Sequence, residues 1–283
     1  MPGVWNRRQF VQTAAGAALA CAAGNRILAA ADNRSKYGGF LMGLQSYTLR
    51  TFPVDKALAT MQELGMSSVE FFDSHFSVGS TDEQIAAMKA KAKDRGLVIL
   101  GHGVNPFSKD DKANRRYFEF AKKVGIRNIS ADPSEDSFDS LDKLVKEFDI
   151  RIAIHNHGPG ARYNKVADVL NAIKGHDERI GACADLGHYI RSAEDPVRAI
   201  NLLKGRLYGV HLKDFAEQKA DTPGVILGKG HLDTEGVFRA LKKVEFPADG
   251  SLSLEYEEHA DDPVADVVEC LAVAAAGATK AAG

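Results

Sequence analysis

The stretch Ile150-Arg151-Ile152-Ala153-Ile154-His155 alternates isoleucine with a second series that ends in histidine. Alternation with a period of two is typical of a β-strand, because successive side chains of a strand point to opposite faces. The isoleucines should pack on a layer of helices, so Arg151, Ala153 and His155 should face the other way. An ionisable residue at the carboxyl end of such a strand is typical of a parallel α/β sheet that carries a site there.

The same kind of strand recurs along the chain, separated by amphipathic helical patterns. We predict eight strands, at residues 41–47, 68–72, 97–102, 126–131, 150–155, 180–185, 207–213 and 251–256. Several helical runs end at a glycine, where a left-handed cap is needed. These glycines are Gly65, Gly96, Gly125, Gly175 and Gly205. Eight strand–helix units in series predict a single (β/α)8 TIM barrel domain over residues 38–280. A doubly wound open sheet is the alternative, disfavoured because no glycine fingerprint for phosphates follows the first strand.

Length and composition agree with one enzyme-sized domain. The chain has 283 residues, of which 45% are hydrophobic, and a formal net charge of −2. This content is enough for one large core. The balanced charge excludes a general nucleic-acid binder, since such a protein needs a basic face.

The first 31 residues differ from the rest and look like a targeting segment. Asn6-Arg7-Arg8-Gln9-Phe10-Val11 is a twin-arginine pattern, a run of small apolar residues follows at 14–23, and Ala29-Ala30-Ala31 precedes Asp32. This order is typical of a signal for the export of folded proteins. We predict a twin-arginine signal peptide over residues 1–31, a periplasmic protein and no stable membrane insertion after signal removal. A lipid anchor at Cys21 and an N-terminal helix that belongs to the fold are the alternatives.

Ionisable residues gather at the predicted carboxyl ends of the strands. Five of the nine histidines and three acids lie at or just past a strand end. They are His102, His155, His157, His188, His211, Glu70, Asp185 and Glu255. Closure of the sheet would bring them around one mouth, where imidazole and carboxylate together suit a divalent ion such as Mn²⁺, Co²⁺ or Zn²⁺. The sequence therefore predicts a shared metal ion, although a single histidine or acid at a strand end more often has a hydrogen-bonded structural role.

The other chemistry-bearing residues carry weaker signals. His75, His176, His231 and His259 fall in predicted loops, and we expect them at the solvated surface. Cys183 and Cys270 share no ligand spacing and are expected to be buried thiols. Gly228-Lys229-Gly230 is either an anion-binding loop or a tight turn.

Six motifs of the chain resemble those of the xylose-isomerase-like barrels, a family of sugar phosphate isomerases and epimerases. The most specific part is Asp185-Leu186-Gly187-His188 followed by His211-Leu212-Lys213-Asp214 on successive strands. The other motifs are Ser68-Val69-Glu70-Phe71-Phe72, Ile154-His155-Asn156-His157-Gly158, Gly228-Lys229-Gly230 and Leu254-Glu255-Tyr256. The resemblance runs from about Leu41 to the C-terminal helix. It implies one divalent metal ion, with Mn²⁺ expected first and Co²⁺, Zn²⁺ or Mg²⁺ as alternatives. It also implies a sugar or keto-sugar substrate and a homo-oligomer.

The resemblance also assigns roles to single residues. The family typically binds its metal through Glu, Asp, His and Glu at the ends of strands five to eight. Asp185, His211 and Glu255 match this pattern, whereas His155 stands in place of the first Glu. We expect these four residues to be the metal ligands.

Substrate contacts are expected from the remaining residues at the same mouth. His188 corresponds to the substrate-contacting histidine of the family. Lys213 is a second candidate contact, and its alternative is an ion pair with Asp214 or a neighbouring acid. The expected set is completed by His157, Glu70 and His102.

The chemistry implied by the resemblance is proton abstraction next to a metal-bound carbonyl. Glu255 or His155 would be the base, and His188 and Lys213 would stabilise the developing oxygen charge. Because His155 replaces a carboxylate, the ion should be a stronger Lewis acid than in relatives with the full set. The expected enzyme is a sugar isomerase or epimerase.

Three other functions remain open at this stage. The first is a lyase that expels a leaving group from a 3-keto-sugar or keto-glycoside. The second is a metal-dependent hydrolase of the endonuclease-type barrel, which the balanced charge disfavours because DNA binding needs basic contacts. The third is a sugar-binding barrel without catalytic activity.

Overall fold

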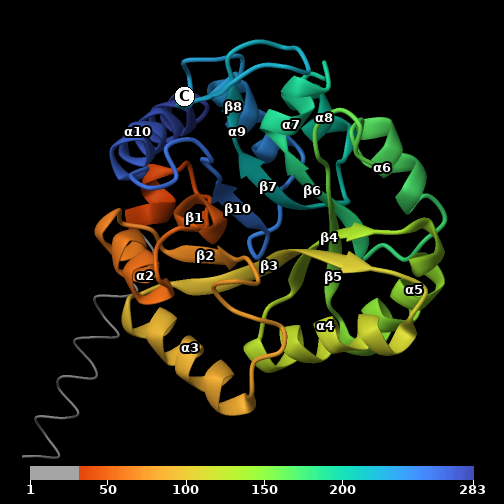
Figure 1. Ribbon diagram of the computed structural model, residues 1–283. Helices are drawn as coiled ribbons and strands as arrows, with labels where there is room; N and C mark the ends of the chain where they lie inside the picture. The colour runs from red at the N-terminus through yellow and green to blue at the C-terminus, as the bar shows by residue number, and fades with distance from the viewer. Residues whose placement is uncertain (1–31) are drawn as a thin grey trace, which may run out of the picture.

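The computed structural model describes residues 32–283, in which eight parallel strands close into a barrel (Figure 1). Around the barrel the order is β1-β10-β7-β6-β5-β4-β3-β2. The strands are β1 (Met42–Gln45), β2 (Ser68–Phe71), β3 (Val98–Phe107), β4 (Asn128–Pro133), β5 (Arg151–His155), β6 (Ile180–Asp185), β7 (Leu207–Leu212) and β10 (Ser251–Leu254). The predicted (β/α)8 fold is confirmed. The signal peptide predicted over residues 1–31 lies outside the described part of the chain.

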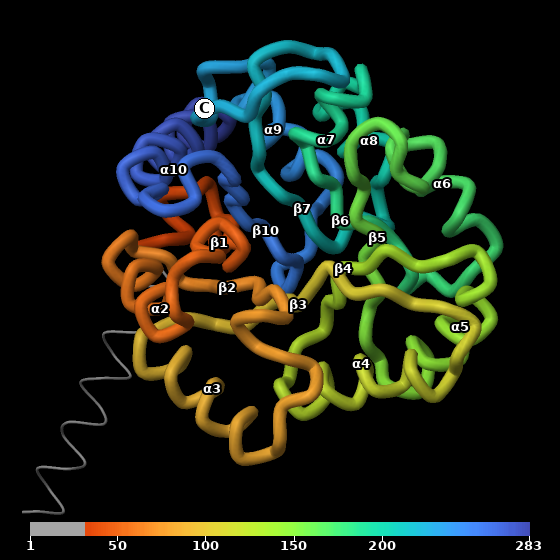
Figure 2. The backbone as a smooth tube through the Cα atoms, viewed as in Figure 1, coloured from red at the N-terminus to blue at the C-terminus, as the bar shows by residue number. Residues whose placement is uncertain are grey.

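Helices form a ring around the barrel and cover the outer face of its sheet (Figures 1 and 2). The helices and short turns are η1 (Ser46–Leu49), α2 (Val54–Glu63), α3 (Asp82–Asp94), α4 (Asp111–Val124), η2 (Glu135–Ser137), α5 (Phe138–Phe148), α6 (Val166–Ile173), α7 (Leu186–Arg191), α8 (Pro196–Leu202), α9 (Thr234–Lys243) and α10 (Val264–Lys280). The local sequence sets their ends. Thr81 and Gln84 form a capping box at the start of α3, and Gly125 ends α4 with a φ of 91°. Among residues 32–283, none of the helices has the length and apolar character that crossing a bilayer requires.

The first and last parts of the described chain close the barrel against each other. Figure 2 shows β1 next to β10 and the last helix, α10, beside them. In the sheet, Leu44 of β1 pairs with Leu254 of β10. A small antiparallel sheet, β8 (Asp214–Phe215) with β9 (Gly224–Val225), lies outside the barrel wall in the connection after β7.

The register of the parallel strands determines which residues meet at the mouth. Asp185 pairs with His211 between β6 and β7, and His211 pairs with Ser253 between β7 and β10. Glu255 follows Ser253 by two residues and therefore keeps the same facing. Ile152 and Ile154 are fully buried in the outer core against the helices, as the alternation of this stretch predicts.

One strand residue departs from the expected alternation. The sequence places Tyr208 on the outer face with Val210 and Leu212, but the ladder passes from Leu207 to Gly209 and skips Tyr208. This bulge turns the Tyr208 ring inward, where it packs with Ala153 and Cys183. Strict alternation along the 207–213 strand therefore gives the wrong face for Tyr208.

Candidate functional site

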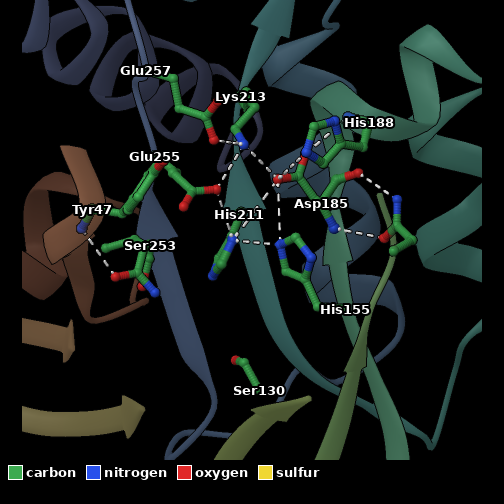
Figure 3. A network of polar contacts seen from close by, with 12 residues as sticks. Tyr47, Ser130, His155, Asp185, His188, His211, Lys213, Ser253, Glu255 and Glu257 are labelled. Atoms are coloured by element: carbon green, nitrogen blue, oxygen red, sulfur yellow. Dashed lines mark hydrogen bonds and ion pairs between the residues drawn. The ribbon is translucent and has the colours of Figure 1, made fainter. Parts of the chain in front are cut away.

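Four side chains from β5, β6, β7 and the end of β10 meet at the mouth of the barrel (Figure 3). One potential ligand atom from each of His155, Asp185, His211 and Glu255 lies within 4.8 Å of the others. His211 Nδ1 lies 3.0 Å from His155 Nε2 and 3.1 Å from Glu255 Oε2. Asp185 Oδ2 lies 3.5 Å from His155 Nε2. The structure thus brings the four predicted ligands together, and we call them the ligand cluster.

The donor atoms of the ligand cluster fit a divalent transition-metal ion. Two imidazole nitrogens and two carboxylate oxygens form the mixed donor set that such ions accept. Asp185 Oδ1 accepts a hydrogen bond from the backbone N–H of His188, whereas Oδ2 faces the cluster, 2.9 Å from Lys213 Nζ and 3.5 Å from His155 Nε2. A buried carboxylate oxygen whose near neighbours are a cation and a potential ligand nitrogen lies in a position that suits a bound cation. The cluster could therefore hold one metal ion, and the identity of the ion stays a prediction.

Lys213 adds a positive charge to the same cluster. Its Nζ lies 2.7 Å from Glu255 Oε2, 2.9 Å from Asp185 Oδ2 and 2.8 Å from Glu257 Oε1. Burial lowers the pKa of Lys213, but the three carboxylates outweigh burial and raise this pKa well above its usual value. Of the two expectations for Lys213, the structure shows the ion pair, with these three acids and not with Asp214.

The charge of Glu255 is set by its neighbours. Burial raises the pKa of Glu255, but Lys213 and His211 more than offset this effect and hold it well below its ordinary value. Glu255 is therefore ionised at neutral pH although only 7% of it is exposed. A buried carboxylate kept ionised beside an open space is available to bind a cation.

Glu70 lies beneath the ligand cluster and not in the space above it. It is fully buried, its Oε2 lies 3.0 Å from His211 Nε2, and it accepts hydrogen bonds from three serine hydroxyls. These are Ser130, Ser251 and Ser253. Burial raises the pKa of Glu70, but His211 and the hydroxyl groups lower it to about 2. The expected substrate contact of Glu70 is corrected to a contact with His211.

His102 also differs from its expected role. Its Nε2 lies 2.8 Å from the Phe76 carbonyl oxygen and its Nδ1 lies 3.0 Å from the Asn105 side-chain nitrogen. Only 2% of His102 is exposed, and burial lowers its pKa. Because both ring nitrogens already have protein partners, His102 supports the wall of the barrel and does not reach a substrate.

A cavity of about 490 Å³ opens above the ligand cluster. We call it the inner cavity. It is lined by Gln45, Tyr47, Phe72, Asp73, Gly103, Val104, His155, His157, His188, Glu255 and Glu257. The ligand cluster contributes polar groups to it, whereas Tyr47 and Phe72 pack edge to face 5.4 Å apart and add an aromatic wall. Polar groups combined with apolar faces are typical of small-molecule sites.

His157 and His188 bring two neutral imidazoles to the inner cavity. Burial and, for His157, the neighbouring His155 lower the pKa of His157 to about 4. Burial lowers the pKa of His188 to about 3. The two rings lie 5.4 Å apart, and Nδ1 of His188 is buried without a partner among residues 32–283. Both expected substrate contacts thus line the cavity as uncharged groups at neutral pH.

Glu257 and Tyr47 are among the cavity residues that the sequence did not identify as site residues. Glu257 continues the inward alternation of Ser253 and Glu255 past the end of β10, so the pattern already contained it. Tyr47 belongs to the η1 turn after β1, where no periodic signal predicts the direction of a side chain.

The Gly228-Lys229-Gly230 segment is a tight turn fastened to Asp214. The Asp214 carboxylate accepts hydrogen bonds from the backbone N–H groups of Gly228 and Gly230, at 3.0 and 3.1 Å, and of His231 and Leu232, at 2.8 and 2.9 Å. Of the two expectations for this segment, the structure shows the turn, because its amides already have a carboxylate partner.

The histidines predicted in loops have different surroundings. His75 is only 8% exposed and its Nε2 lies 2.9 Å from the Phe52 carbonyl oxygen, so its prediction as a surface residue is wrong. His176 is partly buried against Asp142, and His231 and His259 are exposed. Cys183 and Cys270 are buried free thiols, as predicted.

Two known proteins are similar in sequence to part of this chain. Inosose dehydratase from Lacticaseibacillus casei is 26% identical over 134 residues, which is 42% of this chain and 44% of the relative. The 3-oxo-isoapionate decarboxylase from Pectobacterium atrosepticum is 24% identical over 180 residues, 57% of this chain and 63% of that protein. The match therefore spans less than two thirds of either relative.

A solved structure extends the likeness over the whole barrel. The 3-keto-D-glucoside 4-epimerase from E. coli superimposes with a TM-score of 0.66 and 18% identity over 83% of this chain and 98% of that one, which shows a common fold. Residues 58–274 match the family model described as the xylose isomerase-like TIM barrel. The chain is therefore a member of the xylose isomerase-like TIM barrel family.

Proposed function

We propose that the protein is a metal-dependent sugar isomerase or epimerase that removes a proton from the carbon next to a sugar carbonyl. The ligand cluster beneath the inner cavity carries this proposal, because it joins a potential cation site to an ionised carboxylate, Glu255, within one enclosed space. A divalent ion held there, with Mn²⁺ as the proposed ion, would supply Lewis acidity to the carbonyl oxygen.

The residues of the chain divide the remaining work. Glu255 receives the proton, since it is ionised and lines the inner cavity. His188 offers a neutral ring to a substrate oxygen. Lys213 keeps its ammonium on Glu255 and Asp185, so it acts on the charge of the cluster and not by reaching into the cavity. Tyr47 and Phe72 offer apolar faces to a sugar ring.

The fate of the abstracted proton decides the reaction class. Its return to the neighbouring carbon gives isomerisation, and its return to the other face of the same carbon gives epimerisation. A lyase reaction on a keto-sugar is the second candidate, and the names of the two relatives, a dehydratase and a decarboxylase, favour it. Replacement of the family glutamate by His155 argues against a two-glutamate epimerase and does not decide between an isomerase and a lyase.

The experiment that tests the proposal is incubation of the Mn²⁺-loaded protein in D₂O with aldoses, ketoses and 3-keto-glycosides, followed by mass spectrometry and NMR. Deuterium next to a carbonyl is expected for at least one sugar. A new isomer identifies the isomerase or epimerase, and a product that has lost water or an alcohol identifies the lyase. Glu255→Gln serves as the inactive control. If no sugar gains deuterium when the wild-type protein is loaded with Mn²⁺, Co²⁺, Zn²⁺ or Mg²⁺, the proposed function is wrong.

A further inference from the structure

A second cavity of about 450 Å³ adjoins the inner cavity. We call it the outer compartment. It is lined by residues of the connection after β2, the carboxyl-terminal part of β3 and the first turns of α4. Asp73 and Val104 line both spaces. The two spaces therefore adjoin at Asp73 and Val104, and a molecule that extends from the ligand cluster past these side chains would enter the outer compartment.

The carboxyl-terminal part of β3 forms one wall of the outer compartment. The strand was expected to end at His102, yet it continues to Phe107 with a shift of register between His102 and Asn105. The added length carries Val104 and Pro106 along the wall of the space. Val104 is 38% exposed and lines both cavities. Its apolar side chain can therefore contact a ligand in either space.

The lining combines groups that suit a neutral, hydroxyl-rich molecule. Arg116 is exposed and forms no ion pair with any residue from 32 to 283, so its guanidinium is free to donate hydrogen bonds. Asp73 also lines this space and provides a carboxylate, one oxygen of which accepts a hydrogen bond from the Val78 N–H. Tyr117 is half-buried, with its ring tilted 5.0 Å from that of Phe107. One cation and one anion face the same space, which disfavours a strongly charged ligand.

We propose that the outer compartment binds a second hydroxylated unit, such as another sugar ring, that is joined to the sugar reacting in the inner cavity. This rests on the proposed function and names its substrate class: a glycoside of two units and not a free monosaccharide. Each space alone has a volume within the range of small-molecule sites, roughly 300–1,000 Å³. A single sugar ring held over the ligand cluster would leave Arg116 and Tyr117 without contact, because these two residues line only the outer compartment.

The test compares two forms of the sugar that exchanges deuterium in the experiment above, its methyl glycoside and its disaccharide. Steady-state kinetics are measured for the wild type, Arg116→Gln and Tyr117→Ala. Titration calorimetry uses the same disaccharide and methyl glycoside without the carbonyl group. Without it these sugars cannot react, so the titration measures binding alone. Arg115→Gln is the matched control, since Arg115 is the preceding residue of α4 but pairs with Glu147 at 2.6 Å and lines neither cavity.

The expected result is weaker binding of the disaccharide with unchanged binding of the methyl glycoside. Arg116→Gln and Tyr117→Ala should each weaken disaccharide binding and raise its KM roughly tenfold, as expected for one lost contact to a charged or stacking group. Values for the methyl glycoside, and for Arg115→Gln with both sugars, should stay within about twofold of the wild type. Arg116→Gln changes an exposed side chain and keeps the test valid if Tyr117→Ala fails to fold.

Failure of the two proposals can be told apart. If deuterium enters sugars but the variants affect the disaccharide and the methyl glycoside equally, the outer compartment is not a sugar site while the proposed function stands. The same holds if the wild type does not prefer the disaccharide. If no sugar exchanges at all, the proposed function itself fails, and the proposal for the outer compartment, which rests on it, fails with it.

Discussion

Glu70 Oε2 lies 3.0 Å from His211 Nε2, on the side of the imidazole opposite to the ligand cluster. A carboxylate on one ring nitrogen keeps a proton there and leaves the other nitrogen free to act as a ligand. Glu70 is ionised at neutral pH, because its pKa is lowered to about 2, and Ser251 and Ser253 hold the same oxygen. Glu70 thus orients His211 from within the barrel.

Glu70→Gln should therefore weaken metal binding without direct loss of a ligand. The amide is neutral and cannot hold the His211 proton as a carboxylate does. A decrease in Mn²⁺ affinity of roughly 10–100-fold is expected, the usual cost of losing such a supporting group. Calorimetric titration with Mn²⁺ measures it. Ser130→Ala is the control, since Ser130 binds the other oxygen, Oε1. Equal Mn²⁺ affinity in the wild type and Glu70→Gln would show that this contact does not orient a ligand.

Asp185→Ala and His211→Ala test the ligand cluster itself. Each variant removes a donor from the four-residue set, so each should lose its metal ion while the barrel stays folded. Metal per chain is measured by inductively coupled plasma mass spectrometry after dialysis, and circular dichroism reports the fold. Asp73→Ala is a control that removes a carboxylate from the cavity wall but not from the cluster. Full occupancy in both cluster variants would mean that the ligands lie elsewhere.

Lys213→Met tests how the chain balances the charge of the cluster. Without the ammonium, Asp185 and Glu255 are left as buried carboxylates close to each other. Removal of one partner of a buried ion pair typically costs about 3–5 kcal/mol, so the free energy of unfolding of the metal-free variant should fall by about that amount. A divalent cation replaces the lost charge, so Mn²⁺ should raise the Tm of the variant more than that of the wild type.

The measurement is thermal and urea unfolding with a chelator and with Mn²⁺. Glu257→Gln is the matched control. Glu257 is the third partner of Lys213, and the Glu257 side chain is 37% exposed. Only a small change in stability is expected for it. Identical Mn²⁺ shifts in Lys213→Met and the wild type would contradict this account of the charge.

The convergence of the ligand cluster could be predicted from the sequence. The alternation in each strand states which residues face inward, and parallel strands of similar length end at one level. This is why His155, Asp185, His211 and Glu255 could be grouped before their positions were known. The glycines after the helices were equally informative, as Gly125 with its left-handed φ shows.

Depth inside the barrel could not be predicted in the same way. Glu70 and His102 lie on strands where the ladder shifts register, between Val69 and Glu70 in β2 and after His102 in β3. The stagger of the strands decides whether an inward side chain reaches the mouth or stays beneath it, and alternation carries no information on stagger. The burial of His75 was not predicted for another reason. Its loop folds back, so the ring packs on Phe72.

The neutral histidines of the inner cavity predict how stability depends on pH. Burial and His155 lower the pKa of His157 to about 4, against the opposing effects of Asp185 and Asp132, whereas the ring in the unfolded chain titrates near 6.5. Between these two values the unfolded chain binds a proton that the folded chain does not. Lowering the pH through this window therefore favours unfolding, and the contribution of His157 is fully present only above about pH 6.5.

His157→Gln removes this proton uptake and should flatten the dependence. We expect the Tm of the metal-free wild type to fall more steeply from pH 6.5 to pH 4 than that of His157→Gln, with the two curves converging toward acid pH. Thermal unfolding followed by circular dichroism, in buffers with a chelator, measures both slopes. His231→Gln is the control, because His231 is exposed and away from the cavity. Parallel curves for the wild type and His157→Gln would mean that His157 titrates alike in the folded and unfolded chains, and that the cavity does not exclude its charge.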